Sequence, residues 1–157
     1  MSYTSTIYNA LPATEADAPG ASNQVNVIIP NTYTNIAANA FNGKNLVTIY
    51  IPNTITSIGD NAFLGATSLS SITFGVNSLL NSIGQYAFLY ATSLTSINIP
   101  ATVTGIGQYA FYFATSLTSI TVDSSNPNYK SNDGVLFNKA ETTLLQYPLG
   151  KTSQSYN

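Results

Sequence analysis

The sequence predicts an α/β-type solenoid, in which short repeats of a single chain stack on one another. Four Phe residues, Phe41, Phe63, Phe88 and Phe111, recur at nearly equal spacing along the chain. An Ala precedes each Phe, and Leu and Ile residues recur in step with them. A unit this short cannot bury its apolar face alone, so at least about three copies must stack to form a core.

A single repeat shows why strands and turns are expected. Ile97 and Ile99 lie two residues apart and therefore share one face of a strand. Pro100 follows at once and ends the strand, because it cannot donate a hydrogen bond to a neighbour. Gly107 then permits a tight bend, and residues 108–111 have room for only one helical or 3₁₀ turn. The period of about 23 residues lies within the range of leucine-rich repeats.

The repeated motif also resembles a known family. The sequence Leu-Thr-Ser-Ile-x-Ile-Pro, followed by Val-Thr-x-Ile-Gly-x-x-Ala-Phe, is similar to BspA-like (Treponema pallidum type) leucine-rich repeats, over residues 24–149. The resemblance implies a right-handed superhelix of mostly short parallel strands, joined by turns or single-turn helices. The family often has Cys three residues after the Phe, where this chain has Ala66, Ala91 and Ala114. This exchange of one small residue for another should preserve the packing.

We divide the chain into repeats (24–122), a hairpin-containing repeat with a tail (123–157) and an N-terminal arm or linker (1–23). Apolar runs at 133–137 and 143–148 flank a polar turn and predict a β-hairpin. The resemblance implies that another Ile-Pro strand follows, yet the chain stops at 155–157. We therefore expect either a piece of a longer protein or an end covered by something else. The arm could be a cap, an anchor or disordered.

The charge content excludes several classes of partner. Charged residues form 6% of the chain, and the four Lys residues are scattered at positions 44, 130, 139 and 151. Nucleic acid binding needs a clustered basic face, so we expect none. No apolar run is long enough to cross a bilayer, which argues against membrane insertion. The N-terminal segment lacks the basic start and apolar stretch of a signal peptide, although the resemblance implies an extracellular or surface-exposed protein.

The chain also offers little for catalysis. It has no His and no Cys, and the only charge between residues 45 and 122 is Asp60. General acid–base chemistry needs such titratable groups, so we expect no enzyme, no catalytic residue and no cofactor. A calcium site could be drawn from side chains with oxygen ligands, namely Asp123, Asn126, Asn128, Asn132 and Asp133. Their spacing does not match an EF-hand, and Asn and Asp are common turn residues, so no metal site is assigned.

Two surfaces are candidates for binding. The first is the expected concave face, where alternate strand residues should point outward. Its members are Asn26, Ile28, Thr48, Tyr50, Ser71, Thr73, Ser96, Asn98, Ser119 and Thr121. Binding on this face is implied by the resemblance, and the alternative is that Ser and Thr are simply favourable exposed strand residues.

The second candidate surface is an aromatic patch at equivalent turns of adjacent repeats. It comprises Tyr86, Tyr90, Tyr109 and Tyr112, with Phe113 nearby. Aromatic residues are enriched at interfaces, so the patch predicts a contact site. The alternative is that some rings fold over the turn and shield the core, which suits Phe113 better than Tyr90.

Two functions follow as hypotheses. The first is a non-catalytic, adhesin-like recognition module on a cell or particle surface, with a protein or glycan partner. The second is a structural assembly protein, such as a filament, fibre or virion component, whose copies associate head-to-tail. The ion-poor surface favours association, because copies repel each other only weakly.

Overall fold

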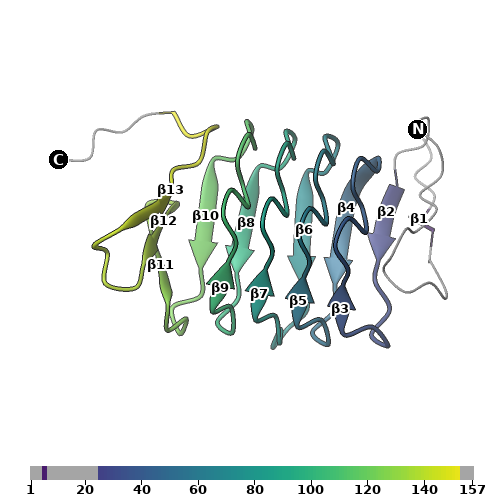
Figure 1. Ribbon diagram of the computed structural model, residues 1–157, viewed down its shortest axis with the longest axis horizontal. Helices are drawn as coiled ribbons and strands as arrows, with labels where there is room; N and C mark the ends of the chain where they lie inside the picture. The colour runs from purple at the N-terminus through teal and green to yellow at the C-terminus, as the bar shows by residue number, and fades with distance from the viewer. Residues whose placement is uncertain (1–4, 7–24, 153–157) are drawn as a thin grey trace.

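The computed structural model describes residues 5–6 and 25–152, and it shows a solenoid in which successive turns stack along one axis (Figure 1). One side is built from parallel strands β1 (Ser5–Thr6), β2 (Val25–Ile28), β4 (Leu46–Ile51) and β6 (Ser71–Phe74), in that order. The same side continues with the parallel pair β8 (Ser96–Ile99) and β10 (Ser119–Val122). The predicted stack of parallel strands is therefore confirmed.

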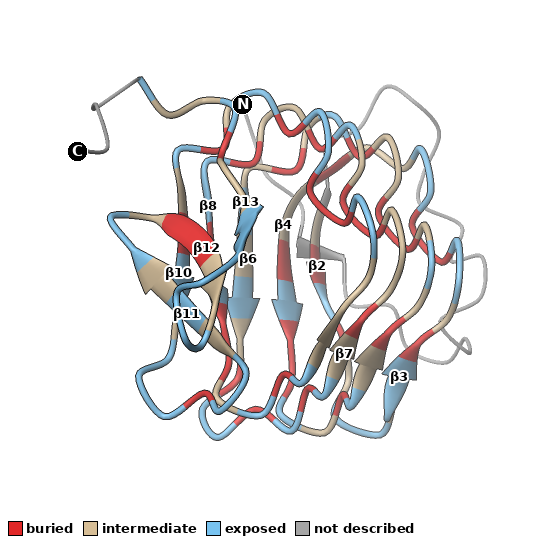
Figure 2. Cartoon of the chain, turned by 60° about the vertical axis from the view of Figure 1, so that its left-hand side comes forward, coloured by how far each residue is buried: buried red, intermediate tan, exposed pale blue. Residues whose placement is uncertain are grey.

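The opposite side carries a second parallel sheet that the repeat spacing does not predict. It consists of β3 (Asn35–Ile36), β5 (Ser57–Ile58), β7 (Ser82–Ile83) and β9 (Gly105–Ile106). Each strand contains one member of the Ile ladder, and Ile36, Ile58 and Ile83 are buried between the two sides. In Figure 2 the one exposed residue of β4 lies between two buried ones, as expected for a strand with one face on the core.

The core is a continuous ladder of side chains. Phe41, Phe63, Phe88 and Phe111 stack in parallel, with centroid distances of 5.2, 5.0 and 5.6 Å. Ala66, Ala91 and Ala114 are fully buried, in agreement with the expectation that small residues keep the packing at these sites. Since every unit contributes the same layer, each ring is covered only when the next unit is in place.

Of the two predicted kinds of connection, turns or single-turn helices, the described residues contain turns and no helix. The segments after the Ile ladder, residues 37–44, 59–66, 84–91 and 107–114, are hereafter called the turn segments. In the last of them Tyr109 and Phe113 have φ of 58° and 54°. Left-handed residues this close together interrupt the right-handed geometry that an α-helix requires. The chain is therefore a β-solenoid rather than an α/β structure.

The role of Gly107 also differs from the prediction. It is not among the residues with positive φ, so no unusual bend requires it. A Cβ at Gly107 would instead lie 2.4 Å from the backbone nitrogen of Gln85, in the preceding turn. Gly59 and Gly84 make similarly close approaches. The glycine is needed because consecutive turns lie closer at this point than a side chain allows.

The C-terminal hairpin is confirmed and extended by one strand. Strands β12 (Val135–Asn138) and β13 (Leu144–Gln146) pair in antiparallel fashion, and β11 (Tyr129–Asn132) adds to the other edge of β12. This sheet lies at the C-terminal end of the solenoid (Figure 1). Leu136 of β12 is buried in the solenoid core. The proposed tail after residue 152 and the N-terminal arm, apart from Ser5 and Thr6, lie outside the described residues.

Candidate functional site

The side chains predicted for the concave face lie on one face of the strands β2, β4, β6, β8 and β10, hereafter the outer sheet face. Parallel register aligns Ile28 with Tyr50 and Tyr50 with Thr73. On the last two strands Asn98 aligns with Thr121. The register therefore turns a repeated sequence pattern into rows of neighbouring side chains.

Hydrogen bonds link neighbours within these rows. The Thr48 hydroxyl donates to the Asn26 side-chain oxygen at 2.8 Å, and the Thr121 hydroxyl donates to that of Asn98 at 3.1 Å. Ile28 and Tyr50 are the large apolar members and remain 47% and 39% exposed. The outer sheet face thus bears mostly hydroxyl and amide groups, with one exposed apolar area around Ile28 and Tyr50 near its N-terminal end.

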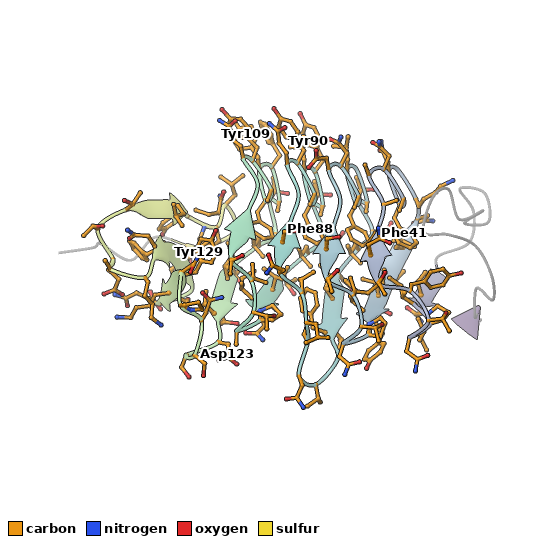
Figure 3. All side chains as sticks on the ribbon, turned by 60° about the horizontal axis from the view of Figure 1, so that its bottom comes forward. Phe41, Phe88, Tyr90, Tyr109, Asp123 and Tyr129 are labelled. Carbon is orange, nitrogen blue, oxygen red and sulfur yellow. The ribbon has the colours of Figure 1, made fainter. Side chains whose placement is uncertain are left out.

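The structure brings the aromatic patch together as one connected group. Tyr86 stacks on Tyr109 with ring centroids 5.6 Å apart, and Tyr90 stacks on Phe113 at 5.1 Å. Tyr112 joins the two pairs, because it contacts Tyr109 at 5.4 Å and Phe113 at 4.5 Å. We call these five residues the aromatic cluster. Tyr90 and Tyr109 project outward along one edge of the solenoid, whereas Phe41 and Phe88 lie inside it (Figure 3).

Phe113 belongs to this cluster, although the sequence favours core shielding for it. Its side chain is 40% exposed and its ring stacks on Tyr90. The signal that could have found it is its spacing. It follows Tyr90 by one repeat period, so the two rings must occupy adjacent turns at the same position.

The backbone beneath the aromatic cluster adopts an unusual conformation. Tyr86, Tyr90, Tyr109 and Phe113 have φ between 54° and 60°. The equivalent positions in the first two turn segments are Asn39, Asn61, Gly43 and Gly65, also with positive φ. Asn and Gly tolerate left-handed geometry, whereas a bulky residue there costs roughly 1–2 kcal/mol. Two turns of the solenoid therefore carry aromatic rings at positions that disfavour them.

A groove lies beside the cluster, between the last turn segment and the C-terminal hairpin. It encloses about 530 Å³, and its lining includes Tyr109 and Tyr112 on one side and Leu145 on the other. The repeat spacing does not predict it, because it depends on how the hairpin packs against the solenoid. A local indication of the groove is Leu145 on β13, an apolar side chain that remains 43% exposed.

One of the candidate calcium ligands, Asn126, has its side chain engaged in other hydrogen bonds. Asn126 is fully buried. Its side-chain oxygen accepts hydrogen bonds from the backbone N–H groups of Asn128 and Tyr129, at 2.9 and 2.8 Å. Its side-chain nitrogen donates to the carbonyls of Pro100 and Val103, both at 2.9 Å. Asn126 therefore links the chain after β10 to the preceding turn, and its side-chain oxygen already accepts two backbone hydrogen bonds.

Two ion pairs form among the described residues, and neither includes a member of these surfaces. Lys130 contacts Glu141 at 3.1 Å and Lys151 contacts Asp133 at 2.9 Å, both within the C-terminal segment. Across residues 5–6 and 25–152, no group of three or more acidic residues could hold a metal ion. The same residues contain no helix long and apolar enough to cross a membrane. The outer sheet face, the aromatic cluster and the groove are all built from uncharged residues.

A solenoid of short, equal turns with a buried Leu, Ile and Phe ladder defines a leucine-rich repeat protein. The comparison with known families makes this specific. The BspA type leucine rich repeat region matches residues 20–138 in six copies, so the chain belongs to this family. No curated protein matches the sequence.

Several solved structures share the fold. The pneumococcal vaccine antigen PcpA is 27% identical with a TM-score of 0.76, over 85% of this chain and 38% of its own. A leucine-rich repeat protein from Eubacterium ventriosum is 32% identical with a TM-score of 0.62, over 83% of this chain and 40% of its own. A leucine-rich repeat protein from Bacteroides capillosus is 26% identical with a TM-score of 0.60, over 71% of this chain and 85% of its own. The chain spans about two fifths of the length of the first two.

Proposed function

We propose that this protein is a non-catalytic recognition module, presented on a cell or particle surface, that contacts a protein or glycan partner through the aromatic cluster. The observation that carries the proposal is the placement of four aromatic residues at positive φ, where the first two turns have Asn or Gly. Backbone strain in a native structure points to function when a less strained residue would serve the fold equally well.

The chemistry of the cluster suits such a partner. Tyr90, Tyr109, Tyr112 and Phe113 are 40–46% exposed, and the phenol groups give hydrogen-bonding tips on apolar bodies. Tyr is favoured at contact surfaces because it buries a large area with few rotatable bonds. The outer sheet face provides a second, polar surface for the same partner. That one relative is described as a vaccine antigen supports surface presentation.

The test is a binding screen of the whole chain against extracellular proteins and arrayed glycans. Variants of this chain are then tested against any partner that the screen finds. Tyr90→Ala should weaken binding by at least about tenfold, as truncation of an aromatic hot spot does. Tyr50→Ala probes the outer sheet face in the same way. Val76→Ala is the matched control, since Val76 is 84% exposed and belongs to neither surface. If neither Tyr variant changes binding, neither the aromatic cluster nor the outer sheet face is the partner surface.

A second candidate function is structural assembly by head-to-tail association, as in a filament, fibre or virion component. The observation that favours it is a set of backbone carbonyls in the first turn segment that find no partner in another turn of the described chain. Among the described residues, the carbonyls of Ala38, Ala40 and Asn42 accept no hydrogen bond from another turn. The equivalent carbonyls of the second turn segment, those of Asp60, Ala62 and Leu64, do so. Strand-like addition of another copy would satisfy such groups.

Electron microscopy and light scattering at several protein concentrations test the assembly function. Filaments, or a mass that rises with concentration, are expected if copies associate end to end. A monomer at every concentration would eliminate this function and leave the recognition module. Deletion of residues 1–23 is the follow-up, because an anchoring arm is needed for assembly whereas a disordered tail is not.

A further inference from the structure

Backbone hydrogen bonds connect each turn segment to the next in a fixed pattern. In the third segment the N–H groups of Tyr86, Phe88 and Tyr90 donate to carbonyls of the following turn, at 3.1, 2.7 and 3.1 Å. The acceptors belong to Gln108, Ala110 and Tyr112. The first and second segments repeat this arrangement with distances between 2.7 and 2.9 Å. Alternate residues of one chain thus donate to alternate residues of a parallel chain, as in a short parallel ladder.

The last turn segment offers the same three donors, but residues 5–6 and 25–152 provide no acceptor for them. Among the described residues, the N–H groups of Tyr109, Phe111 and Phe113 make no hydrogen bond. Phe111 is only 2% exposed, so its N–H sits at a site where bulk water is restricted. An unpaired donor in such a place costs free energy, which an incoming carbonyl would recover.

The groove between this segment and the hairpin is lined by two of these donor residues, Tyr109 and Phe111, and Phe113 follows just beyond its lining. Its lining includes the consecutive residues 108–112 of the last turn segment. Tyr129, Leu136 and Leu145 from the hairpin region contribute to the opposite wall. Its volume of about 530 Å³ lies within the usual range for binding pockets. The space therefore has a backbone edge on one side and apolar side chains on the other.

We propose that this groove binds an extended, uncharged polypeptide segment of another protein, as a strand parallel to residues 108–113. The segment's alternate carbonyls accept hydrogen bonds from Tyr109, Phe111 and Phe113. The residue at its centre is small, because Ala62, Ala87 and Ala110 hold the equivalent position inside the solenoid. The groove lining contains no Asp, Glu, Lys or Arg, so a charged residue would lose its water without gaining a partner.

A polypeptide strand fits this site better than the alternatives. A sugar can stack on Tyr109 or Tyr112, but it cannot supply carbonyls spaced at every second residue. A whole second solenoid would meet the hairpin that forms the other wall (Figure 1), so head-to-tail association of copies would use surfaces outside the groove. The inference does not rest on the aromatic cluster being the partner surface, because the hydrogen bonds come from backbone N–H groups and only Tyr109 and Tyr112 of the five cluster residues line the groove.

The first experiment follows individual backbone amides of the whole chain by NMR hydrogen exchange. Without ligand, the amides of Tyr109 and Phe113 should exchange faster than those of Tyr86 and Tyr90, which are hydrogen-bonded. The probe is a blocked peptide with the sequence of residues 38–43, Ala-Asn-Ala-Phe-Asn-Gly, which is uncharged and has Ala at the central acceptor position. At saturation it should slow exchange at Tyr109, Phe111 and Phe113 by roughly tenfold or more. A peptide of reversed sequence is the control for direction.

The second experiment places a charge in the groove. Leu145→Asp should weaken peptide binding by roughly tenfold or more, because the carboxylate must be desolvated without a partner. Leu144→Asp is the matched control, since Leu144 precedes it on β13, is 53% exposed and does not line the groove. Both residues are exposed, so both variants should fold, and this is checked by their unfolding temperatures.

Several outcomes would overturn the proposal. They include no binding to the wild-type chain, equal binding of the reversed peptide, and equal losses in the two Asp variants. Protection of the three amides that rises with protein concentration alone would assign the groove to a second copy. Protection that is independent of both concentration and peptide would assign it to the chain itself.

Discussion

Tyr90 stacks on Phe113 with ring centroids 5.1 Å apart, although both residues hold the backbone in the left-handed region. The stacking offsets part of the free energy that the left-handed backbone conformation costs. A stacked aromatic pair contributes about 0.5–1.5 kcal/mol beyond the area that it buries, which is comparable to the strain of one residue at positive φ. Replacing one of the two residues therefore relieves about as much strain as the lost stacking contributed, and this leads to the first prediction.

Tyr90→Gly and Tyr86→Asn, which restore residues found in the earlier turns, should leave the free energy of unfolding within about 1 kcal/mol of the wild type. The relief of strain offsets the loss of ring contacts and, for Gly, the added freedom of the unfolded chain. Urea denaturation followed by circular dichroism measures the change. A loss of about 3 kcal/mol or more in either variant, the size expected for a core ring, would mean that the rings serve the fold rather than a partner.

Gly107→Ala should destabilise the protein by about 2 kcal/mol or more, because its Cβ would lie 2.4 Å from the backbone nitrogen of Gln85. The nearest atoms are backbone, so no flexible group can move aside. Gly105→Ala is the matched control, since the nearest atom to its Cβ is the Ser82 Cβ at 3.9 Å. The midpoint of urea unfolding should fall for the first variant and stay nearly unchanged for the second. Equal shifts would contradict the close approach of the turns.

Phe88→Ala should cost about 3–5 kcal/mol, the usual range for removing a large buried ring. Phe88 is fully buried and stacks on both Phe63 and Phe111, so its loss leaves a cavity between two layers. Phe113→Ala provides the comparison and should cost less than about 1.5 kcal/mol, because that ring is 40% exposed. The ratio of the two losses in unfolding free energy tests whether the inner ladder, and not the aromatic cluster, stabilises the solenoid.

Asn126→Ala should cost about 3 kcal/mol, because it removes four hydrogen bonds and leaves buried backbone groups unsatisfied. Asn128→Ala removes one side-chain hydrogen bond, to the carbonyl of Thr104, at an exposed position and should cost about 1 kcal/mol. Thermal unfolding of both variants measures the difference. Addition of calcium to the wild type should leave its unfolding temperature unchanged, whereas a rise that saturates would contradict the structural role of Asn126.

The repeat could be predicted from the sequence because its signal is a fixed spacing. Phe88 and Phe111 recur one period apart, so any regular stacking must bring them into contact. The same argument places Tyr50 beside Thr73 and groups the aromatic residues, since equal positions in adjacent turns become neighbours. Both candidate surfaces are therefore identifiable from the sequence as sets of residues.

The spacing could not reveal how the turns are closed. Whether residues 107–114 form a helical turn or a left-handed turn depends on the hydrogen bonds that the segment makes with an adjacent turn. The carbonyl of Ala110, for example, accepts from the N–H of Phe88, one repeat earlier. The role of Gly107 escapes the sequence for the same reason, because the atoms that exclude a side chain there belong to Gln85 and Gly84, one repeat earlier.

The sequence by itself thus determined the repeat family, the stacked core and the uncharged character of both candidate surfaces, since these depend on residue type and period alone. Only the tertiary structure decided that aromatic rings occupy strained positions. It also decided that Tyr109, Phe111 and Phe113 are left with unpaired N–H groups beside a groove, among the residues that the structure describes. The physical reason is that the hairpin from β11 to β13 replaces the next regular turn. Where the regular stacking stops, the hydrogen bonds that each turn makes to its neighbour have no internal partner in the described part of the chain.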